Sequence, residues 1–411
     1  MSDLGLHPAR VPDGFGELGG ELSIGGRRAS DWAAEAGTPL FVYDRALIAA
    51  RVAGLRAALP DAMRLHYAIK ANPMPELVAW MRGQVDGFDV ASGGELALAV
   101  AQGIAPERIG FAGPGKRDAE LTAAVQAGAT LNIESAGEFA RAIAIANAAS
   151  RPLRAALRIN PDFDLKGSGM RMGGGAKPFG VDVDQAPALL RAMAVHGVDF
   201  RGFQIFAGSQ NLDAARLIEA ERATIALAAR LAENAPGPVY HLNLGGGFGI
   251  PYFPADKRLD VEAVGEALGE AWATRPAILA DTVPIIELGR YLVGEAGVYL
   301  TRVVDRKVSG GETFLVTDGG LHQQLAASGN FGTVIRRNYP VANASRFAEP
   351  AAERVNVVGC LCTPLDRLGE RVALPHSEVG DLVAVFMAGA YGLTASPTAF
   401  LGHSAPAERF A

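Results

Sequence analysis

From residue 64 onward, short apolar runs alternate with longer stretches of mixed polarity. An apolar run that stops at Gly, Asn or Ser is typical of a buried strand followed by a turn. Eight such runs cover residues 64–70, 88–92, 109–113, 130–134, 155–160, 202–206, 241–245 and 284–289. The stretches between most of them are rich in Ala, Leu, Glu and Arg and predict helices, for example over 94–101, 136–149 and 212–234. Eight strands alternating with helices across about 240 residues predict an α/β protein with a (β/α)8 TIM barrel, and their even spacing favours closure over an open doubly wound sheet.

The pattern changes after Arg290. Apolar runs at 298–304, 313–317, 354–358 and 382–387 predict strands without long helices between them. An earlier strand, over 40–43, is not needed by the barrel. We therefore expect a barrel domain over 45–290 and a C-terminal β domain over 291–411, which is completed by residues 1–44.

Composition narrows the class of protein. The 411 residues are 49% hydrophobic and 20% charged, with a formal net charge of −6, which argues against a nucleic-acid partner. Two cysteines, Cys360 and Cys362, cannot form a disulfide framework and favour a reducing compartment. The first residues lack the features of a secretion signal, and no apolar run reaches the roughly 20 residues that span a bilayer. We therefore expect a cytoplasmic protein that does not bind membranes.

Lys70 is the first candidate for chemistry. It is one of six lysines in the chain, and it stands at the end of an apolar strand directly before Ala-Asn-Pro. Such a lysine either reaches solvent at the strand end, or is desolvated so that its amine can form a Schiff base with a carbonyl cofactor. Residues 66–73 alone leave both interpretations open.

Polar and glycine residues gather at the ends of the predicted strands. Active sites of TIM barrels lie at the carboxyl ends of the strands, and a phosphate is often held by the last loops. In this chain those ends carry Lys70, Asp89, Ser92, Asn160, Ser209, Gly245, Gly246, Gly247, Glu287 and Arg290. A glycine triplet brings backbone N–H groups close to an anion, although it marks a simple turn more often. Glu287 and Arg290 are equally compatible with a structural ion pair.

Seven short motifs in order along the chain carry a family resemblance. They are Tyr67-Ala-Ile-Lys70-Ala-Asn, Phe88-Asp-Val-Ala-Ser-Gly-Gly-Glu95, Ala207-Gly-Ser-Gln210, Asn243-Leu-Gly-Gly-Gly247, Glu287-Leu-Gly-Arg290, Cys362 with Asp366, and Gly389-Ala-Tyr391. With them the chain resembles the fold-type III pyridoxal-phosphate decarboxylases, the family of ornithine and diaminopimelate decarboxylases. Three further stretches, 206–212, 289–295 and 362–366, look like the decarboxylase-like subgroup associated with exosortase systems.

The resemblance implies a cofactor, pyridoxal 5′-phosphate, and a set of residues that bind it. Lys70 would carry the cofactor as a Schiff base. The other implied cofactor-binding residues are Asp89, Phe206, Ser209, Gly245, Gly246, Gly247, Glu287, Gly289, Arg290 and Tyr391. Glu287 would face the pyridine nitrogen and keep it protonated, which favours decarboxylation over racemisation.

The resemblance also implies that Cys362 reprotonates Cα, reaching in from the other subunit of a homodimer with shared active sites. Without the resemblance, Cys362 reads as a buried small hydrophobe. Cys360 is interpreted as structural, because a metal site built on this cysteine pair would need a second pair. No metal is expected, and His322 is left out of the site.

The chain departs from the family pattern at three positions. Phe206 stands where the family usually places a histidine over the cofactor ring. Thr363 follows the cysteine where diaminopimelate enzymes carry an acidic residue, and Ala326 stands where an arginine is expected for a distal carboxylate. Thr363 and Asp366 remain the candidate substrate-binding residues, and Arg336 and Arg337 are alternative partners for a carboxylate.

Together these features predict an enzyme, a carboxy-lyase that removes the α-carboxylate of an L-amino acid or a derivative. Its catalytic residues would be Lys70, Cys362 and Glu287. The alternatives are a decarboxylase of a carrier-protein-tethered amino acid, an amino-acid racemase or epimerase, and a regulatory protein that binds the cofactor without catalysis.

Overall fold

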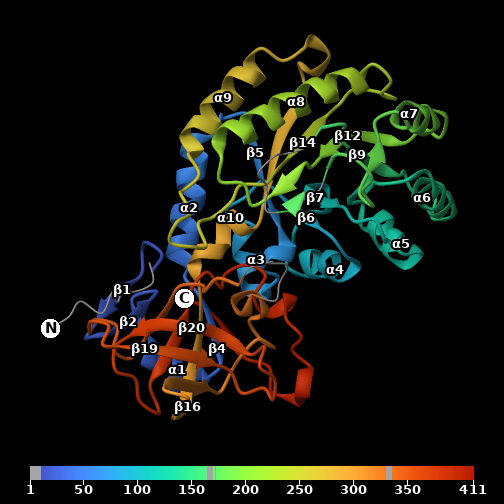
Figure 1. Cartoon of the computed structure of the whole chain (residues 1–411). Helices are drawn as coiled ribbons and strands as arrows, with labels where there is room; N and C mark the ends of the chain where they lie inside the picture. Colours follow the sequence, from blue (N-terminus) through green and yellow to red (C-terminus); the bar gives the residue numbers. More distant parts are fainter. Residues whose placement is uncertain (1–10, 164–169, 172, 330–335) are drawn as a thin grey trace. The chain divides into compact units, whose positions relative to one another are not determined.

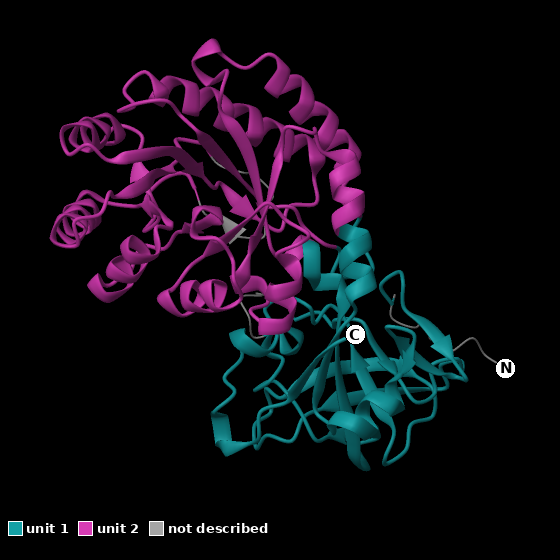
Figure 2. Ribbon diagram, turned by 180° about the vertical axis from the view of Figure 1, so that it is seen from behind, with its two compact units in different colours: residues 1–51, 251–257, 292–411 teal, residues 52–250, 258–291 magenta. Residues whose placement is uncertain are grey.

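The computed structural model describes residues 11–163, 170–171, 173–329 and 336–411. Residues 1–10, where no secretion signal was found, lie outside this part, as does Lys166, one of the six lysines of the chain. The chain divides into two compact units, shown in different colours in Figure 2. Unit 2 contains residues 52–250 and 258–291, and unit 1 contains residues up to 51, 251–257 and 292–411. No helix in the described part of the chain is both long enough and apolar enough to cross a membrane.

Unit 2 is a closed barrel of eight parallel strands, which confirms the predicted fold class (Figure 1). The strands are β5 (Arg64–Ala68), β6 (Gly87–Val90), β7 (Ile109–Phe111), β8 (Thr130–Ile133), β9 (Arg154–Asn160), β12 (Asp199–Ile205), β14 (His241–Gly246) and β15 (Val283–Leu288). Hydrogen bonding between β8 and β9 and between β15 and β5 closes the ring. Most of these strand residues are buried, because helices cover the outside while side chains fill the inside.

Helices follow most of the strands around the barrel. They are α3 (Pro75–Met81), α4 (Gly93–Ala101), α5 (Asp118–Ala127), α6 (Ala136–Ala148), α7 (Ala186–Val195), α8 (Ala214–Ala232), α9 (Val261–Ala273) and the short α10 (Arg290–Val293). Ser92 and Ser135 begin α4 and α6 by accepting the backbone N–H groups of Glu95 and Glu138. Because these caps follow β6 and β8 within a few residues, the local sequence fixes where each strand ends and its helix begins.

Unit 1 is built mainly from β-strands. Its large sheet has the order β18 (Val341–Asn343), β21 (Leu382–Val385), β16 (Gly297–Ser309), β17 (Glu312–Thr317), β19 (Glu353–Val358) and β20 (Arg367–Leu374). The early strand β4 (Leu40–Tyr43) pairs with both β16 and the last strand, β22 (Ala407–Phe410). Helices α1 (Ala29–Ala36) and α2 (Arg45–Ala58) and a small sheet of β1 (Gly16–Leu18), β2 (Glu21–Ile24) and β3 (Arg27–Arg28) belong to the N-terminal segment.

The strand that was predicted over 64–70 is shorter than expected. β5 ends at Ala68, and Lys70 lies in a 3-10 turn, Ile69–Ala71. The turn forms because Asn72 organises it: the Tyr67 hydroxyl donates to the Asn72 carbonyl at 2.8 Å, and the Asn72 N–H donates to the Ile69 carbonyl at 3.0 Å. Lys70 is exposed, which is the first of the two alternatives for this lysine, a side chain that reaches solvent at the strand end. Its role as a Schiff-base lysine stays a prediction.

Candidate functional site

The turn that carries Lys70 packs tightly against the end of β15. A Cβ atom added to Gly289 would lie 2.7 Å from the Cβ of Ala71 and 3.2 Å from the carbonyl oxygen of Ala68. Only glycine fits at this position, and the contact fixes the Lys70 turn beside the segment that carries Glu287. The lysine and the carboxylate therefore come from neighbouring strands at the same end of the barrel.

Glu287 is held by two amide side chains from inside the barrel. Its Oε2 atom accepts hydrogen bonds from Gln204 Nε2 at 2.8 Å and from Asn243 Nδ2 at 3.3 Å. Desolvation and the neighbouring Asp89 carboxylate raise the pKa of Glu287, while Lys70 and Gln204 act in the opposite direction. The two amides fix the direction of the carboxylate, and Lys70 is close enough for its charge to influence it.

Gln204 and Asn243 were missed by the sequence argument. Both side chains are buried, on β12 and β14, and the Oε1 atom of Gln204 has no hydrogen-bond partner among the described residues. The available signal was an amide residue in the middle of an apolar strand, in Gly-Phe-Gln-Ile-Phe and His-Leu-Asn-Leu-Gly. A buried amide needs a hydrogen-bond partner. Each of these amides therefore indicates a polar group inside the barrel, which apolar packing alone does not require.

Asp89 lies on β6, the strand that pairs with β5. It is 5% exposed on β6, and its Oδ2 lies 3.0 Å from His66 Nδ1 on β5. The predicted residues Asp89 and Glu287 are neighbours within the barrel, and the charge of Asp89 raises the pKa of Glu287.

The glycine triplet forms a tight loop after β14. Gly245 and Gly247 have φ angles of +73° and +74°, which side-chain-bearing residues rarely adopt. A Cβ atom on Gly245 would lie 2.5 Å from the ring of the half-buried Phe206. The Gly245 N–H donates to Asn243 Oδ1 at 2.8 Å, so it is already used inside the loop. The loop is buried and has no side chains of its own, so a phosphate group could approach its backbone closely once it occupied the site.

Hydrogen bonds join this loop to the loop after β12. The Asn211 N–H donates to the Gly247 carbonyl at 2.9 Å, and the Gly249 N–H donates to the Asn211 carbonyl at 2.8 Å. Ser209, two residues before Asn211, is half-buried in the short strand β13 (Gly208–Ser209). The structure therefore brings the Ser209 and Gly245–Gly247 loops together. Arg290 begins α10 directly after β15, at the same end of the barrel.

A second concentration of charge lies at the opposite end of the barrel. A cavity of about 340 Å³ there is lined by the first residues of several strands, including Arg64, Ile109, Thr130, His241 and Val283. Burial and nearby cationic groups, Arg201 first among them, lower the pKa of His241 to about 4. In TIM barrels this end contributes to stability and the carboxyl end carries the chemistry, so we place the candidate site at the Lys70 end.

The remaining predicted residues lie in unit 1. Cys362 is exposed and Thr363 is half-buried, both in the turns after β19. Asp366 is 2% exposed, and its two oxygens accept the N–H groups of Leu321 and Leu361 at 2.6 and 2.8 Å. Tyr391 has a φ angle of +53°. The assignment of Asp366 to the substrate stays a prediction.

Comparison with known proteins gives a consistent family. Residues 45–294 match the family model for the pyridoxal binding domain of pyridoxal-dependent decarboxylases. The L-glutamyl-(BtrI acyl-carrier protein) decarboxylase of Niallia circulans is 39% identical over 380 residues, with 90% of this chain and 88% of that protein covered. The diaminopimelate decarboxylase of Aquifex aeolicus is 34% identical over 390 residues, with 92% and 87% covered.

Solved structures agree with the sequences. The crystal structure of diaminopimelate decarboxylase from M. jannaschii superposes with a TM-score of 0.85 at 25% identity, covering 97% of this chain and 92% of that chain. The diaminopimelate decarboxylase from Helicobacter pylori, complexed with L-lysine, gives a TM-score of 0.81 at 25% identity, covering 93% of this chain and 94% of that chain.

The residues of the barrel fit this cofactor. An aldehyde needs an amine, a pyridine nitrogen needs an acid that can share a proton, and a phosphate needs a loop whose backbone it can approach without side chains in between. Lys70, Glu287 with its raised pKa, and the Gly245–Gly247 loop meet these three needs at one end of unit 2. The chain belongs to the pyridoxal-dependent decarboxylase family, as an amino-acid decarboxylase that uses pyridoxal 5′-phosphate.

Proposed function

We propose that the substrate is an L-aminoacyl group tethered to an acidic carrier protein by a phosphate-bearing arm. The observation that carries this proposal is a basic cleft in unit 1. A cavity of about 480 Å³ is lined by four arginines, together with Phe253, Tyr339 and Glu370. The arginines are Arg336, Arg337, Arg354 and Arg371. A guanidinium group can donate two parallel hydrogen bonds to the oxygens of one phosphate or carboxylate. Because arginines outnumber acids in this cleft, it can bind a phosphate group and the acidic surface of a partner protein.

Two of the arginines are poorly neutralised by acids. Arg337 lies over the Phe253 ring at 3.6 Å from its centroid, and the carboxylate of Asp256 is 3.9 Å away. Arg371 reaches Glu312 only at 3.4 Å, with both side chains largely exposed. Arg336 is better paired, because it lies 2.9 Å from Glu370. Positive charge therefore remains available to a partner.

The relative from Niallia circulans supports the same substrate class, since its name places a glutamyl group on an acyl-carrier protein. Thr363 is consistent with this, because a tethered substrate does not require an acidic residue there to bind a distal amine. A free diamino acid is the second candidate, favoured by the diaminopimelate decarboxylases among the relatives.

Within the reaction we propose one role for each of three residues. Lys70 would hold the aldehyde end of the cofactor through its amine, and its exposed position leaves room for the substrate amine to approach. Glu287, oriented by Gln204 and Asn243, holds a proton at the pyridine nitrogen. Bound pyridoxal phosphate supplies the electron sink that stabilises the carbanion left by CO₂. Cys362 then delivers a proton to Cα, and this fits its exposed position. A carboxylate at position 287 favours CO₂ loss over racemisation.

We propose that Ser209, Gly246, Gly247, Arg290 and Tyr391 bind the phosphate, while Asp89, Phe206, Gly245 and Gly289 shape the pocket. We also propose a cytoplasmic homodimer in which Cys362 serves the barrel of the partner subunit. Mixing inactive Lys70→Ala and Cys362→Ala proteins tests this arrangement. Random pairing makes about half of the dimers mixed, and each mixed dimer has one intact site of two, so the mixture should regain about a quarter of wild-type activity. No recovery after verified exchange of subunits would contradict shared sites.

The substrate proposal is tested by measuring CO₂ and amine release from free L-amino acids, aminoacyl-carrier proteins and aminoacyl thioesters without phosphate. We expect turnover of the carrier-bound form at a KM well below that of the other two. Exchanging the exposed Arg354 and Arg371 for Glu should raise the KM for the carrier-bound substrate by roughly 10–100-fold. The control Arg28→Glu changes an exposed arginine of unit 1 outside the cleft. Equal KM values for free and carrier-bound substrates would contradict the proposal.

A further inference from the structure

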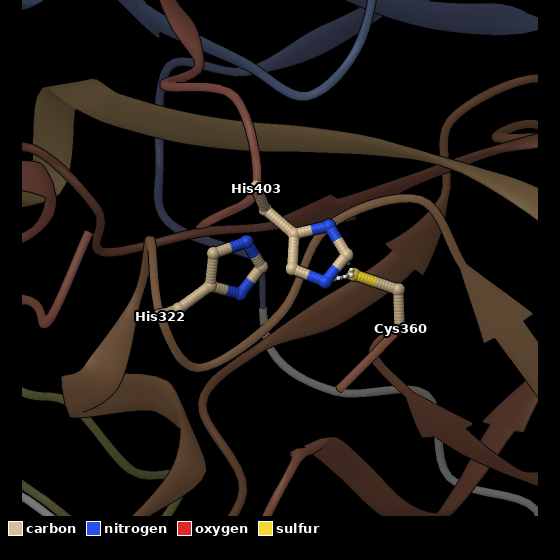
Figure 3. A group of neighbouring side chains, drawn as sticks. All are labelled: His322, Cys360 and His403. Carbon is tan, nitrogen blue, oxygen red and sulfur yellow. Dashed lines mark hydrogen bonds between the residues drawn. The ribbon is translucent and has the colours of Figure 1, made fainter. Parts of the chain in front are cut away.

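Three potential metal ligands meet in unit 1: His322, Cys360 and His403. Figure 3 shows the imidazole rings of His322 and His403 side by side, with the Cys360 sulfur directed at the His403 ring. Their ligand atoms all lie within 4.8 Å of one another. Cys360 Sγ is 3.9 Å from both ring nitrogens of His403, and the two ring centroids are 5.0 Å apart.

Each ligand comes from a different segment of the unit. His322 follows β17, Cys360 follows β19, and His403 lies between a 3-10 turn, Phe400–Gly402, and β22. These segments are far apart in sequence: Cys360 and His403 are separated by 43 positions. The fold therefore brings these residues together, and no local sequence motif predicts the cluster.

Asp366 fixes two of the three segments. It accepts the N–H of Leu321 with one oxygen and the N–H of Leu361 with the other. Leu321 precedes His322 and Leu361 follows Cys360, so this one buried carboxylate ties together the two turns that carry these ligands. The ligands are thus held in place by backbone anchored to a rigid group.

His322 provides an independent indication of a ligand. Its side chain is fully buried, and neither ring nitrogen has a hydrogen-bond partner among the described residues. Buried polar groups are almost always satisfied, so an imidazole with two unsatisfied nitrogens requires an explanation.

We propose that His322, Cys360 and His403 bind a divalent transition-metal ion of the zinc class. Two imidazoles and a thiolate are the donor types that such ions prefer. Tetrahedral zinc, with Zn–N of about 2.0–2.1 Å and Zn–S of about 2.3 Å, places its ligand atoms roughly 3.3–3.7 Å apart. The observed 3.9 Å between Cys360 and His403 needs only a small closure to reach this spacing. Three protein ligands leave a fourth position for water or a substrate group.

This cluster could not be predicted from the sequence, where only a second cysteine pair was expected to complete a metal site at Cys360 and Cys362. In the structure two histidines supply what a second pair would have supplied. Metal binding gives Cys360 a role distinct from that of Cys362, two residues away. It also attaches the segment around His403 to the turns after β17 and β19.

The test uses the holoenzyme, freed of metal by a chelator and titrated with Co²⁺ and then with competing Zn²⁺. We expect one Co²⁺ per chain, with d–d bands of tetrahedral coordination at longer wavelengths than the absorption of the cofactor. Bound Zn²⁺ should also protect one of the two cysteines from a thiol reagent, and peptide mapping should identify the protected residue as Cys360.

Ligand and control variants make the result specific. Cys360→Ser and His403→Asn should each weaken Co²⁺ binding by roughly 100-fold or more and abolish the tetrahedral bands. His403 is exposed, so its variant should fold even if a change at His322 does not. Cys362→Ser and His376→Asn, which change an exposed cysteine and an exposed histidine of the same unit, should leave metal binding unchanged. Absence of stoichiometric binding, or equal binding by the ligand and control variants, would overturn the proposal.

Discussion

The loops after β5 and β7 each carry a lysine, and the two lysines have opposite environments. Lys70 is exposed in its 3-10 turn, near the carboxylate of Glu287. Lys116 is 4% exposed, and its ammonium group contacts Glu138 at 2.7 Å and the carbonyls of Gly113 and Asn132 at 2.9 Å. Both follow apolar strands, so lysine scarcity and strand position do not distinguish them.

The environments of the two lysines differ in a way that fits the reactive role proposed for Lys70 and a structural role for Lys116. All three donors of the Lys116 ammonium are used by neighbouring groups, and this lysine holds the loop after β7 to β8 and α6. Burial lowers the pKa of Lys116 against the opposing effect of Glu138, and it raises the pKa of Glu138. Lys70 instead lies beside a carboxylate that two amides hold in place. Lys70 therefore differs from Lys116 by the fixed carboxylate of Glu287 near it, and not by burial of its amine.

The largest expected effect concerns Lys70. Lys70→Ala should lower kcat/KM by roughly 10³-fold or more, because the residue that binds the cofactor is removed. The free energy of unfolding of the apoprotein should change by no more than about 0.5 kcal/mol, since the side chain is exposed. Turnover assays and urea unfolding of the apoproteins measure the two quantities. A large loss of stability would show that Lys70 is structural like Lys116.

Lys116→Met should show the opposite behaviour. It leaves Glu138 buried without its partner, and the expected loss of stability is about 3–5 kcal/mol. Adding Glu138→Leu should restore most of it, because an apolar pair can replace a buried ion pair. Urea unfolding of the single and double variants measures the recovery. A double variant as unstable as the single one would argue against the ion pair as the cause.

A smaller loss of activity is expected when Glu287 is changed. Glu287→Gln removes the group that shares a proton with the pyridine nitrogen, so kcat should fall by roughly 100-fold while cofactor is retained. Gln204→Leu, which removes one of the amides that orient Glu287, should cost less, about 10-fold. Steady-state kinetics with cofactor content measured on the same samples separates catalysis from binding. Unchanged kcat in Glu287→Gln would exclude the proposed role.

The smallest effect is expected at the other end of the barrel. The pKa of His241 is lowered from 6.5 to about 4 in the folded protein, chiefly by burial and then by Arg201. Between pH 6.5 and pH 4 the unfolded chain binds the proton more readily, so stability decreases as the pH falls through this range. Allowing for partial solvent exposure, we expect a loss of about 1–2 kcal/mol. His241→Gln should flatten the curve of unfolding free energy against pH, and an unchanged slope would contradict this account.

The sequence predicts the barrel well because apolar periodicity directly reports which residues are buried. All eight barrel strands were found, with ends that differ by a few residues from those expected. Strands β18, β20 and β22 were missed: Val341–Asn343 is very short, and β20 and β22 carry charged residues that hide their alternation. Helix caps at Ser92 and Ser135 are local signals, and they coincide with the observed helix starts.

The site could be predicted only in part. Glycines and charged residues at strand ends identified Glu287 and the Gly245–Gly247 loop, because barrel geometry brings strand ends together. The roles of Gln204 and Asn243, the amides that hold Glu287, were not predicted, because a single Gln or Asn inside a strand has no periodic signature. The cluster of His322, Cys360 and His403 depends on the tertiary fold of unit 1, which no local pattern specifies.

The central claim is that the cofactor is bound covalently by Lys70 and by no other lysine. Reducing the holoenzyme with borohydride fixes the cofactor to its amine, and mass spectrometry of the peptides then locates it. The account predicts one cofactor per chain, on the peptide that contains Lys70. A label on another lysine such as Lys116, or no label on an active enzyme, would contradict it.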